Sequence, residues 1–171
     1  MYVYKDVING GKLFVDLSPI SEVDDFVYEV ECPKEGDILE IFNIQPVEMD
    51  KNTYHQYTRK YLRRLTHHML SKSDNREEVL AFGKSFDAYV KDKVLPHFDD
   101  FEPVWVKGGD GMVLLIGKRD DGTIYLKYWK HGLEREEVEE ENERYEWEFK
   151  YNYGKYGSHH EWDEDEDEDE N

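Results

Sequence analysis

Apolar and polar residues alternate through most of the first 45 residues. Tyr2 to Ile8 and Lys12 to Leu17 read as two strands that flank Asn9-Gly10-Gly11, a typical hairpin turn. A polar connection follows at residues 18–25. Phe26 to Cys32 then reads as a half-buried strand, with Phe26, Tyr28, Val30 and Cys32 on one face and Glu29 and Glu31 on the other. Asp37 to Ile44 reads as a more apolar strand after a turn. This pattern predicts a four-stranded antiparallel meander.

The period changes from two to 3.6 at Asp50. Apolar residues then recur every three or four positions, at Tyr54, Tyr57, Tyr61, Leu62, Leu65 and Met69. Asp74 and Glu77 fit a capping box that begins a second helix, which Pro96 ends. Two helices joined by a short polar turn predict an antiparallel helix pair.

The alternation returns after Pro103. Strands are predicted at residues 104–107, 112–118 and 123–129, with glycine-rich and aspartate-rich turns between them. Residues 134–144 are nearly all charged and predict a solvated helix or loop. Tyr145 to Tyr153 places five aromatic residues on one side of a strand, where they either cover the helices or form an exposed platform.

The order of strands, two helices and strands predicts an α+β fold, in which an antiparallel sheet packs on the helix pair. The sheet combines the N-terminal meander with the C-terminal hairpins. We expect one globular domain at residues 1–157, followed by a disordered acidic tail at residues 158–171.

Charge is segregated along the chain. The net charge is −19, yet residues 50–72 carry six cations against Asp50 alone. Four of these cations, Arg59, Lys60, Arg63 and Arg64, fall within an arc of about 140° on the first helix, mostly opposite its aromatic stripe. They are a candidate site for phosphate, for an acidic partner or for the chain's own tail. The alternative is a solvated helix face that pairs with acidic residues elsewhere in the fold.

Two acidic blocks form the other candidate binding surface. An extended run of Asp and Glu places a carboxylate about every 3.3 Å, close to the phosphate spacing of one DNA strand. These residues would mimic a nucleic-acid backbone toward a basic protein, although such a run can also serve only as a solubilising tail. The candidates are Glu136, Glu137, Glu139, Glu140, Glu141, Asp163, Glu164, Asp165, Glu166, Asp167, Glu168, Asp169 and Glu170.

These features favour a non-enzymatic acidic interaction protein: an inhibitor, immunity protein or nucleic-acid mimic that binds a basic nucleic-acid-handling protein. The alternative is a single-stranded nucleic-acid-binding protein with an autoinhibitory tail, in which aromatic residues stack on bases. In its aromatic richness and acidic C-terminus, the layout resembles phage and bacterial single-strand-binding proteins, although this tail ends in Asn171 rather than a hydrophobic residue. A small enzyme and a structural role are the remaining hypotheses.

The chain carries no recognisable catalytic motif, so no catalytic residue, cofactor or metal site is predicted. Adjacent His67 and His68 diverge on a helix, and the single Cys32 excludes an internal disulfide. Without a signal-peptide pattern or a long apolar run, the expected location is the cytoplasm and no membrane partner is expected.

Overall fold

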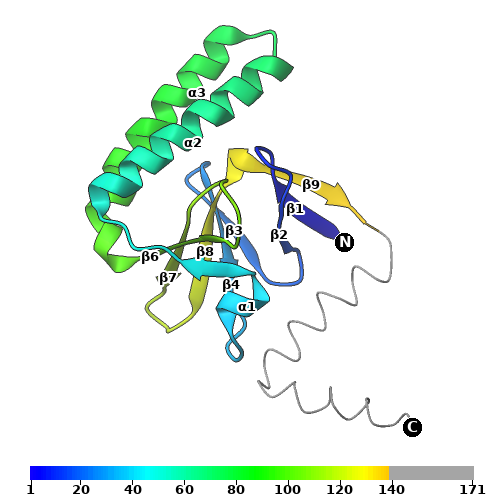
Figure 1. Cartoon of the computed structure of the whole chain (residues 1–171), viewed down its shortest axis with the longest axis vertical. Coiled ribbons are helices and arrows are strands. Elements are labelled where there is room, and N and C mark those ends of the chain that lie inside the picture. The colour runs from blue at the N-terminus through cyan, green and yellow to red at the C-terminus, as the bar shows by residue number, and fades with distance from the viewer. Residues whose placement is uncertain (139–171) are drawn as a thin grey trace.

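The structure is a computed structural model that describes residues 1–138 (Figure 1). The predicted strand at residues 145–153, the predicted acidic tail and the boundary at residue 157 lie outside the described residues. Within residues 1–138, antiparallel strands form two sheets beside a pair of long helices. The predicted α+β class is therefore confirmed.

The larger sheet has six strands, which pair in the order β3-β4-β8-β7-β6-β5, all antiparallel. In chain order the strands are β3 (Ile20–Val23), β4 (Val27–Glu31), β5 (Ile44–Pro46), β6 (Glu102–Val106), β7 (Leu114–Lys118) and β8 (Ile124–Trp129). Its central strands β7 and β8 bury Leu114, Leu115 and Leu126 almost completely. Because successive residues of a strand point to opposite faces, burial of both Leu114 and Leu115 means that this part of β7 is covered on both faces.

The smaller sheet has the order β2-β1-β9. Its strands are β1 (Tyr2–Asp6), β2 (Lys12–Val15) and β9 (Leu133–Glu137). Strand β9 follows a short helical turn, η3 (Lys130–Gly132), and pairs with β1 from Tyr2 opposite Glu137 to Asp6 opposite Leu133. The two ends of the described chain therefore lie side by side.

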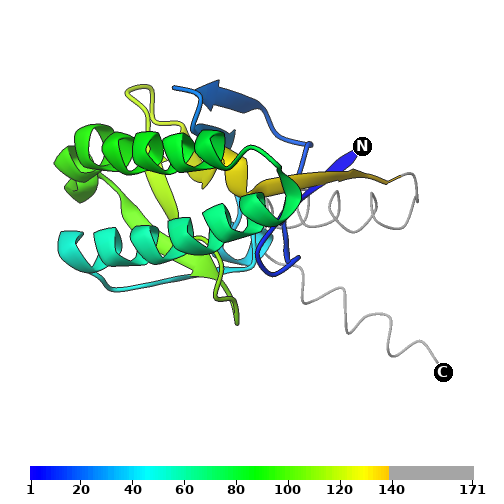
Figure 2. The same ribbon diagram turned by 90° about the horizontal axis from the view of Figure 1, so that it is seen from above.

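The two long helices form an antiparallel hairpin, α2 (Lys51–Lys72) and α3 (Arg76–Tyr89), whose turn extends beyond both sheets (Figures 1 and 2). Asp50 caps α2 by accepting a 2.8 Å hydrogen bond from the Thr53 amide, which satisfies one of the free N–H groups at the helix start. Asn75, rather than the predicted Asp74, caps α3. The helix then continues through a π-helical turn, η1 (Val90–Val94), and a 3-10 turn, η2 (Leu95–Asp100).

One hydrophobic core joins the hairpin to both sheets. The predicted stripe of α2 supplies Tyr54, Tyr61 and Leu65, all buried. The ring centroids of Tyr54 and Phe98 lie 5.1 Å apart. The ring centroids of Phe86 on α3 and Trp129 on β8 lie 4.7 Å apart. The periodicity that predicted the helix pair thus also identified its buried faces.

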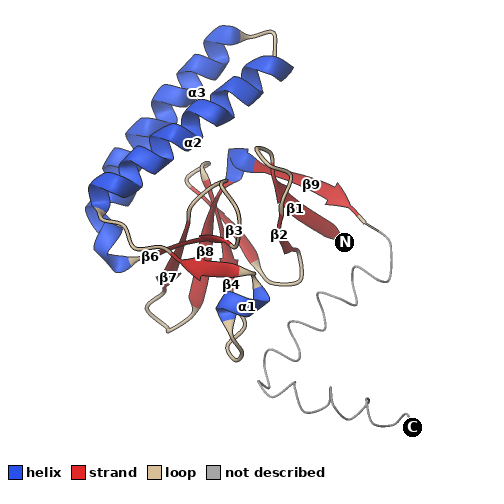
Figure 3. Ribbon diagram, viewed as in Figure 1, coloured by secondary structure: helices blue, strands red, loops and turns tan. Residues whose placement is uncertain are grey.

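Three local predictions are wrong (Figure 3). Residues 37–44 do not form a strand, because Ile38–Ile41 is the short helix α1, capped by Asp37. The polar connection contains the edge strand β3, whose exposed Ser21 and Glu22 hid it from the apolar pattern. Within the charged stretch predicted as helix or loop, residues 134–137 belong to β9.

The predicted single meander is also divided, because β1 and β2 pair in the smaller sheet while β3 and β4 belong to the larger one. The division follows from the pairing of β1 with β9, whose residues are about 130 positions later in the chain. In the part of the chain that the structure describes, no helix combines the length and apolar character needed to cross a membrane.

Candidate functional site

A buried carboxyl group joins the hairpin to the smaller sheet. Asp6, at the end of β1, is only 2 % exposed. Its Oδ1 accepts hydrogen bonds from the Ile8 amide at 2.9 Å and from the Tyr61 hydroxyl of α2 at 3.0 Å. Its Oδ2 accepts a 2.9 Å bond from the Met112 amide. Three segments distant in sequence therefore meet at one side chain, which explains how a buried carboxyl group is tolerated.

The loop before Met112 fits closely against this junction. A Cβ atom on Gly111 would lie 2.1 Å from Asp6 Oδ2, so only glycine fits there without a shift. The Asp110 carbonyl accepts a 2.7 Å hydrogen bond from Arg64 of α2, and Asn9 of the β1–β2 turn donates to the Asp110 carboxylate at 3.4 Å. The glycine-rich loop thus faces carboxyl groups, which would repel a phosphate instead of binding it.

The remaining predicted cations lie on the outer face of α2, opposite its buried residues. We call Arg59, Lys60 and Arg63 the basic strip. All three are exposed, and within residues 1–138 none of them has an ion pair or a side-chain hydrogen bond. The structure thereby separates the four predicted cations, because Arg64 is held by the Asp110 loop while the basic strip is unpaired.

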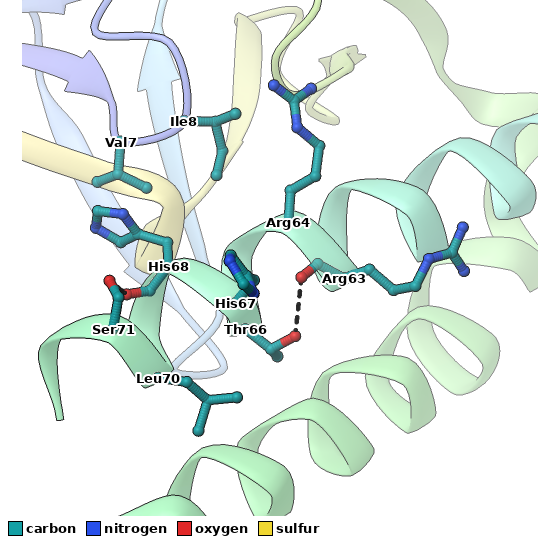
Figure 4. Close-up of a pocket in the computed structure, with 9 residues that line it drawn as sticks. All are labelled: Val7, Ile8, Arg63, Arg64, Thr66, His67, His68, Leu70 and Ser71. Carbon is teal, nitrogen blue, oxygen red and sulfur yellow. Dashed lines mark hydrogen bonds between the residues drawn. The ribbon is translucent and has the colours of Figure 1, made fainter. Parts of the chain in front are cut away.

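An open groove runs beside the basic strip, between α2 and the β1–β2 turn (Figure 4). Its volume is about 820 Å³. In Figure 4, the His68 side chain points toward Val7 and the Arg64 side chain toward the loop region, while Arg63 extends along the outside of the helix. The residues that line this α2 groove are Val7, Ile8, Arg63, Arg64, Thr66, His67, His68, Leu70 and Ser71.

The α2 groove combines positive charge with apolar surface. Arg63 and Arg64 offer charged donors, and Val7, Ile8 and Leu70 offer aliphatic contact. This combination suits an anionic chain that also carries some apolar surface, such as an acidic peptide. It contains no nucleophile paired with a base, so it does not have the constellation of an acyl-transfer site.

A second, smaller depression lies near the turn between α2 and α3, where His131 contacts the Phe82 ring at 4.5 Å between ring centroids. Burial is the main cause that lowers the pKa of His131, and the charge of Lys130 lowers it further. The Nδ1 atom of His131 is buried without a hydrogen-bond partner among residues 1–138. The neutral imidazole is therefore the form that this site favours.

Other titratable groups also argue against a reactive centre in the described part. Burial raises the pKa of the Cys32 thiol to about 12, so the nucleophilic thiolate is suppressed. Burial, together with the neighbouring Asp6, raises the pKa of Tyr61 well above its usual value. Residues 1–138 contain no group of three His, Cys, Asp or Glu side chains placed to hold a metal ion.

The predicted acidic surface is represented only at β9. Glu136 forms an ion pair with Lys5 of the neighbouring strand, and Glu137 is exposed at the strand end. The other predicted acidic residues, from Glu139 onward, lie outside the described residues.

The Asp6 junction was missed by sequence reasoning. Asp6 stands between Lys5 and Val7 in an ordinary strand pattern, and nothing in that pattern distinguishes it from an exposed aspartate. The one available signal is its position two residues before Ile8, which allows a side-chain bond to the Ile8 amide at the start of a turn. Burial of the carboxyl group depends on Tyr61 and Met112, which only the fold brings near.

Comparison with known proteins gives one consistent family. The sequence profile described as "TCTP: Translationally controlled tumour protein" matches residues 33–134. Curated relatives named "Translationally-controlled tumor protein homolog" from Gibberella zeae and Yarrowia lipolytica are 29 % and 30 % identical to the chain. Each alignment covers 81 % of this chain and 100 % of the relative.

Solved structures agree with these sequence matches. The translationally controlled tumor-associated protein p23fyp from Schizosaccharomyces pombe superposes with a TM-score of 0.67 at 28 % identity, covering 81 % of this chain and all of that one. The translationally-controlled tumor protein from Caenorhabditis elegans superposes with a TM-score of 0.64 over 82 % of this chain and all of that one; at 20 % identity it supports the fold alone.

These matches overturn the predicted function. The inhibitor, immunity-protein and nucleic-acid-mimic hypotheses are wrong, and so is the single-stranded nucleic-acid-binding alternative. Composition misled because net acidity and aromatic richness are shared by unrelated proteins, and the aromatic residues Tyr54 and Tyr61 that could have stacked on bases are buried in the core. The family match spans well over half of the chain, with the whole length of its relatives aligned, and so the chain belongs to the translationally controlled tumour protein family.

Proposed function

We propose that this protein is a binding protein that holds an acidic segment of a partner protein against the basic strip and the α2 groove. The observation that carries the proposal is the unpaired state of Arg59, Lys60 and Arg63 on one face of a rigid helix. A chain with 41 Asp and Glu against 22 Lys and Arg has ample carboxylates to pair them, yet none in residues 1–138 does so.

The geometry of α2 favours a peptide-like ligand. Residues three or four positions apart on a helix lie about 5–6 Å apart at Cβ, so Arg59 and Arg63 can contact one ligand together. Arginine binds a carboxylate through two parallel N–H bonds, which lysine cannot do. Since the helix is 22 residues long and packs on the core along its opposite face, the cations are presented on a preorganised support.

The direct test is binding of a synthetic peptide of eight alternating Asp and Glu residues. It uses full-length protein in which residues 163–170 are changed to Asn and Gln, so that they cannot compete; we call this the neutral-tail variant. At low salt we expect measurable binding, and changing Arg59, Lys60 and Arg63 to Gln in this background should weaken it roughly tenfold, since each exposed pair contributes about 0.2–1 kcal/mol. Binding should also weaken as salt rises.

A matched control separates the site from net charge. Lys34, Lys84 and Lys93 are exposed and lack ion pairs within the described range, so changing all three to Gln removes the same charge from other surfaces. This control should bind the peptide like its parent. Equal weakening in both triple variants would show that binding follows overall charge, and would contradict the proposed site.

The predicted basic protein partner and the predicted cytoplasmic location do not depend on the basic strip. A basic protein partner for the acidic residues stays a prediction, because eleven of the thirteen lie outside residues 1–138 and Glu136 is already paired with Lys5. A cytoplasmic location is likewise proposed from the sequence pattern alone.

A further inference from the structure

We propose that the chain's own acidic segment, Glu161 to Glu170, occupies the basic strip and the adjoining α2 groove, and thereby competes with an external acidic partner. The inference rests on the proposed function, because the same cations serve both ligands. Three features support it: charge complementarity, the length of chain between the smaller sheet and the acidic segment, and the pairing of Arg119, Lys127 and Lys130 at the larger sheet.

The charges are complementary in sign and spacing. Residues 161–170 contain nine acidic side chains, interrupted only by Trp162. In an extended segment, side chains on the same side recur about every 7 Å, close to the separation of residues one turn apart on a helix. Successive carboxylates could therefore reach Arg59 and Arg63 in turn, with Lys60 beside them.

The chain leaves the described fold about one strand length from the groove. The Val138 amide donates to the Met1 carbonyl at 2.9 Å, so residue 138 lies at the start of β1. Val7 and Ile8, which line the groove, lie just beyond the other end of this strand. The five residues of β1 separate Met1 from Val7, and the six steps between them span roughly 20 Å.

The connecting chain is long enough for this span. Residues 139–162 number 24, and a segment of that length reaches about 36 Å even as a helix and up to about 80 Å when extended, more than the span required. Because the acidic segment belongs to the same chain, its contact with the basic strip does not depend on protein concentration, so a weak contact can be occupied even in dilute solution.

Arg119, Lys127 and Lys130, on or beside the larger sheet, offer no comparable site, because they are already paired. Arg119 binds Glu31 at 2.8 Å and Glu29 at 3.1 Å, and Lys130 binds Glu22 at 2.7 Å. An acidic segment would have to displace these carboxylates. At the basic strip it displaces only water and counterions.

Zero-length carbodiimide cross-linking of the full-length wild-type chain tests the contact. Lys60 should form amides with carboxylates of residues 163–170, detected by mass spectrometry as the tryptic peptide 156–171 joined at Lys60. Lys84, on the exposed side of α3 and without an ion pair in residues 1–138, is the matched control. We expect several-fold more of this product at Lys60 than at Lys84, and the excess should disappear in 0.5 M NaCl. Similar yields at both lysines would overturn the proposal.

A mixture of isotopically light and heavy protein establishes which chain supplies the tail. Cross-links at Lys60 should join residues of the same isotope, and frequent mixed products would contradict an intramolecular contact. In addition, the neutral-tail variant should bind the acidic peptide about tenfold more tightly than the wild-type chain.

The two proposals fail in different ways. If the neutral-tail variant binds the peptide no more tightly than wild type and Lys60 shows no excess of cross-links, tail docking is wrong while the acidic-partner site stands. If Lys60 cross-links as expected but the neutral-tail variant does not bind the peptide, the proposed function is wrong while the tail contact stands.

Discussion

The two faces of α2 differ in burial and in bonding: the inner face is packed in the core, and the outer face is exposed. On the inner face, Tyr54, Tyr61 and Leu65 are at most 4 % exposed, and the Tyr61 hydroxyl is bound to Asp6. On the outer face, the basic strip contacts no partner among the residues described. One helix therefore holds the fold together with one side and leaves the other available for binding.

The surface of the larger sheet sharpens this contrast. There, Arg119 and Lys127 share Glu29, and Arg119 also binds Glu31. The fold thus pairs its cations where carboxylates lie on a neighbouring strand, and leaves the basic strip unpaired. Substitutions on the inner face should change stability, whereas substitutions on the outer face should change binding only.

The largest effect is expected at the Asp6 junction. Asp6→Ala removes the acceptor for the buried Tyr61 hydroxyl and Met112 amide, and should lower the free energy of unfolding by about 3 kcal/mol, since each unsatisfied buried group costs about 1–3 kcal/mol. Urea unfolding followed by circular dichroism measures it. Asp120→Ala, at an exposed position in a turn, should stay within about 0.5 kcal/mol of wild type. A loss below 1 kcal/mol at Asp6 would mean that the junction does not stabilise the fold.

A pair of glycines probes the packing of the hairpin. A Cβ atom on Gly132 would lie 2.2 Å from the Tyr61 hydroxyl oxygen, so Gly132→Ala should cost about 2 kcal/mol of unfolding free energy. Gly83 of α3 is the control, because its Cβ would meet Thr66 Cγ2 at an ordinary 3.5 Å. Gly83→Ala should be neutral or stabilise by up to about 1 kcal/mol through helix propensity. Equal effects at both glycines would contradict the close approach of Tyr61 to Gly132.

Arginines on the sheet and on the helix should differ in stability effect. Arg119→Gln breaks two partly exposed ion pairs and should cost about 1 kcal/mol, less in 0.5 M NaCl. Arg63→Gln should leave the unfolding free energy within about 0.3 kcal/mol of wild type, because no pair is lost. A comparable loss at Arg63 would reveal a partner for the basic strip and weaken the proposed function.

The smallest effect concerns pH. Because burial lowers the pKa of His131 in the folded protein, the unfolded chain binds the proton more readily as pH falls below about 6.5. Stability should therefore decline between pH 7.5 and pH 5.5 by an amount that His131→Gln removes. If His131→Gln kept the wild-type slope, the decline would have to arise from other titratable groups.

Local sequence patterns predicted the helices better than the strands. The spacing of Tyr54, Tyr61 and Leu65 predicted α2 and its buried face, and Asp50 marked its start. The short run Ile38–Ile41 was ambiguous, because four apolar-rich residues fit a strand or a helical turn equally well. Strand β3 was missed because an edge strand needs few apolar residues.

The candidate site was predicted only in part. The sequence placed Arg59, Lys60, Arg63 and Arg64 on one arc, but the bond from Arg64 to the Asp110 loop joins residues 46 positions apart and has no local signal. The α2 groove needs Val7 and Ile8 beside α2, a proximity set by the β1–β9 pairing and the Asp6 junction.

The sequence by itself determined the α+β class, the amphipathic helix pair and the outward direction of the basic strip, since each depends on a repeat of two or 3.6 residues that neighbouring positions set. Only the tertiary structure decided that the strands divide into two sheets, that Asp6 is buried beneath α2, and that the basic strip lacks a partner within residues 1–138. Those outcomes depend on contacts between residues far apart in the chain. A local sequence pattern does not specify which distant residues will contact it in the fold.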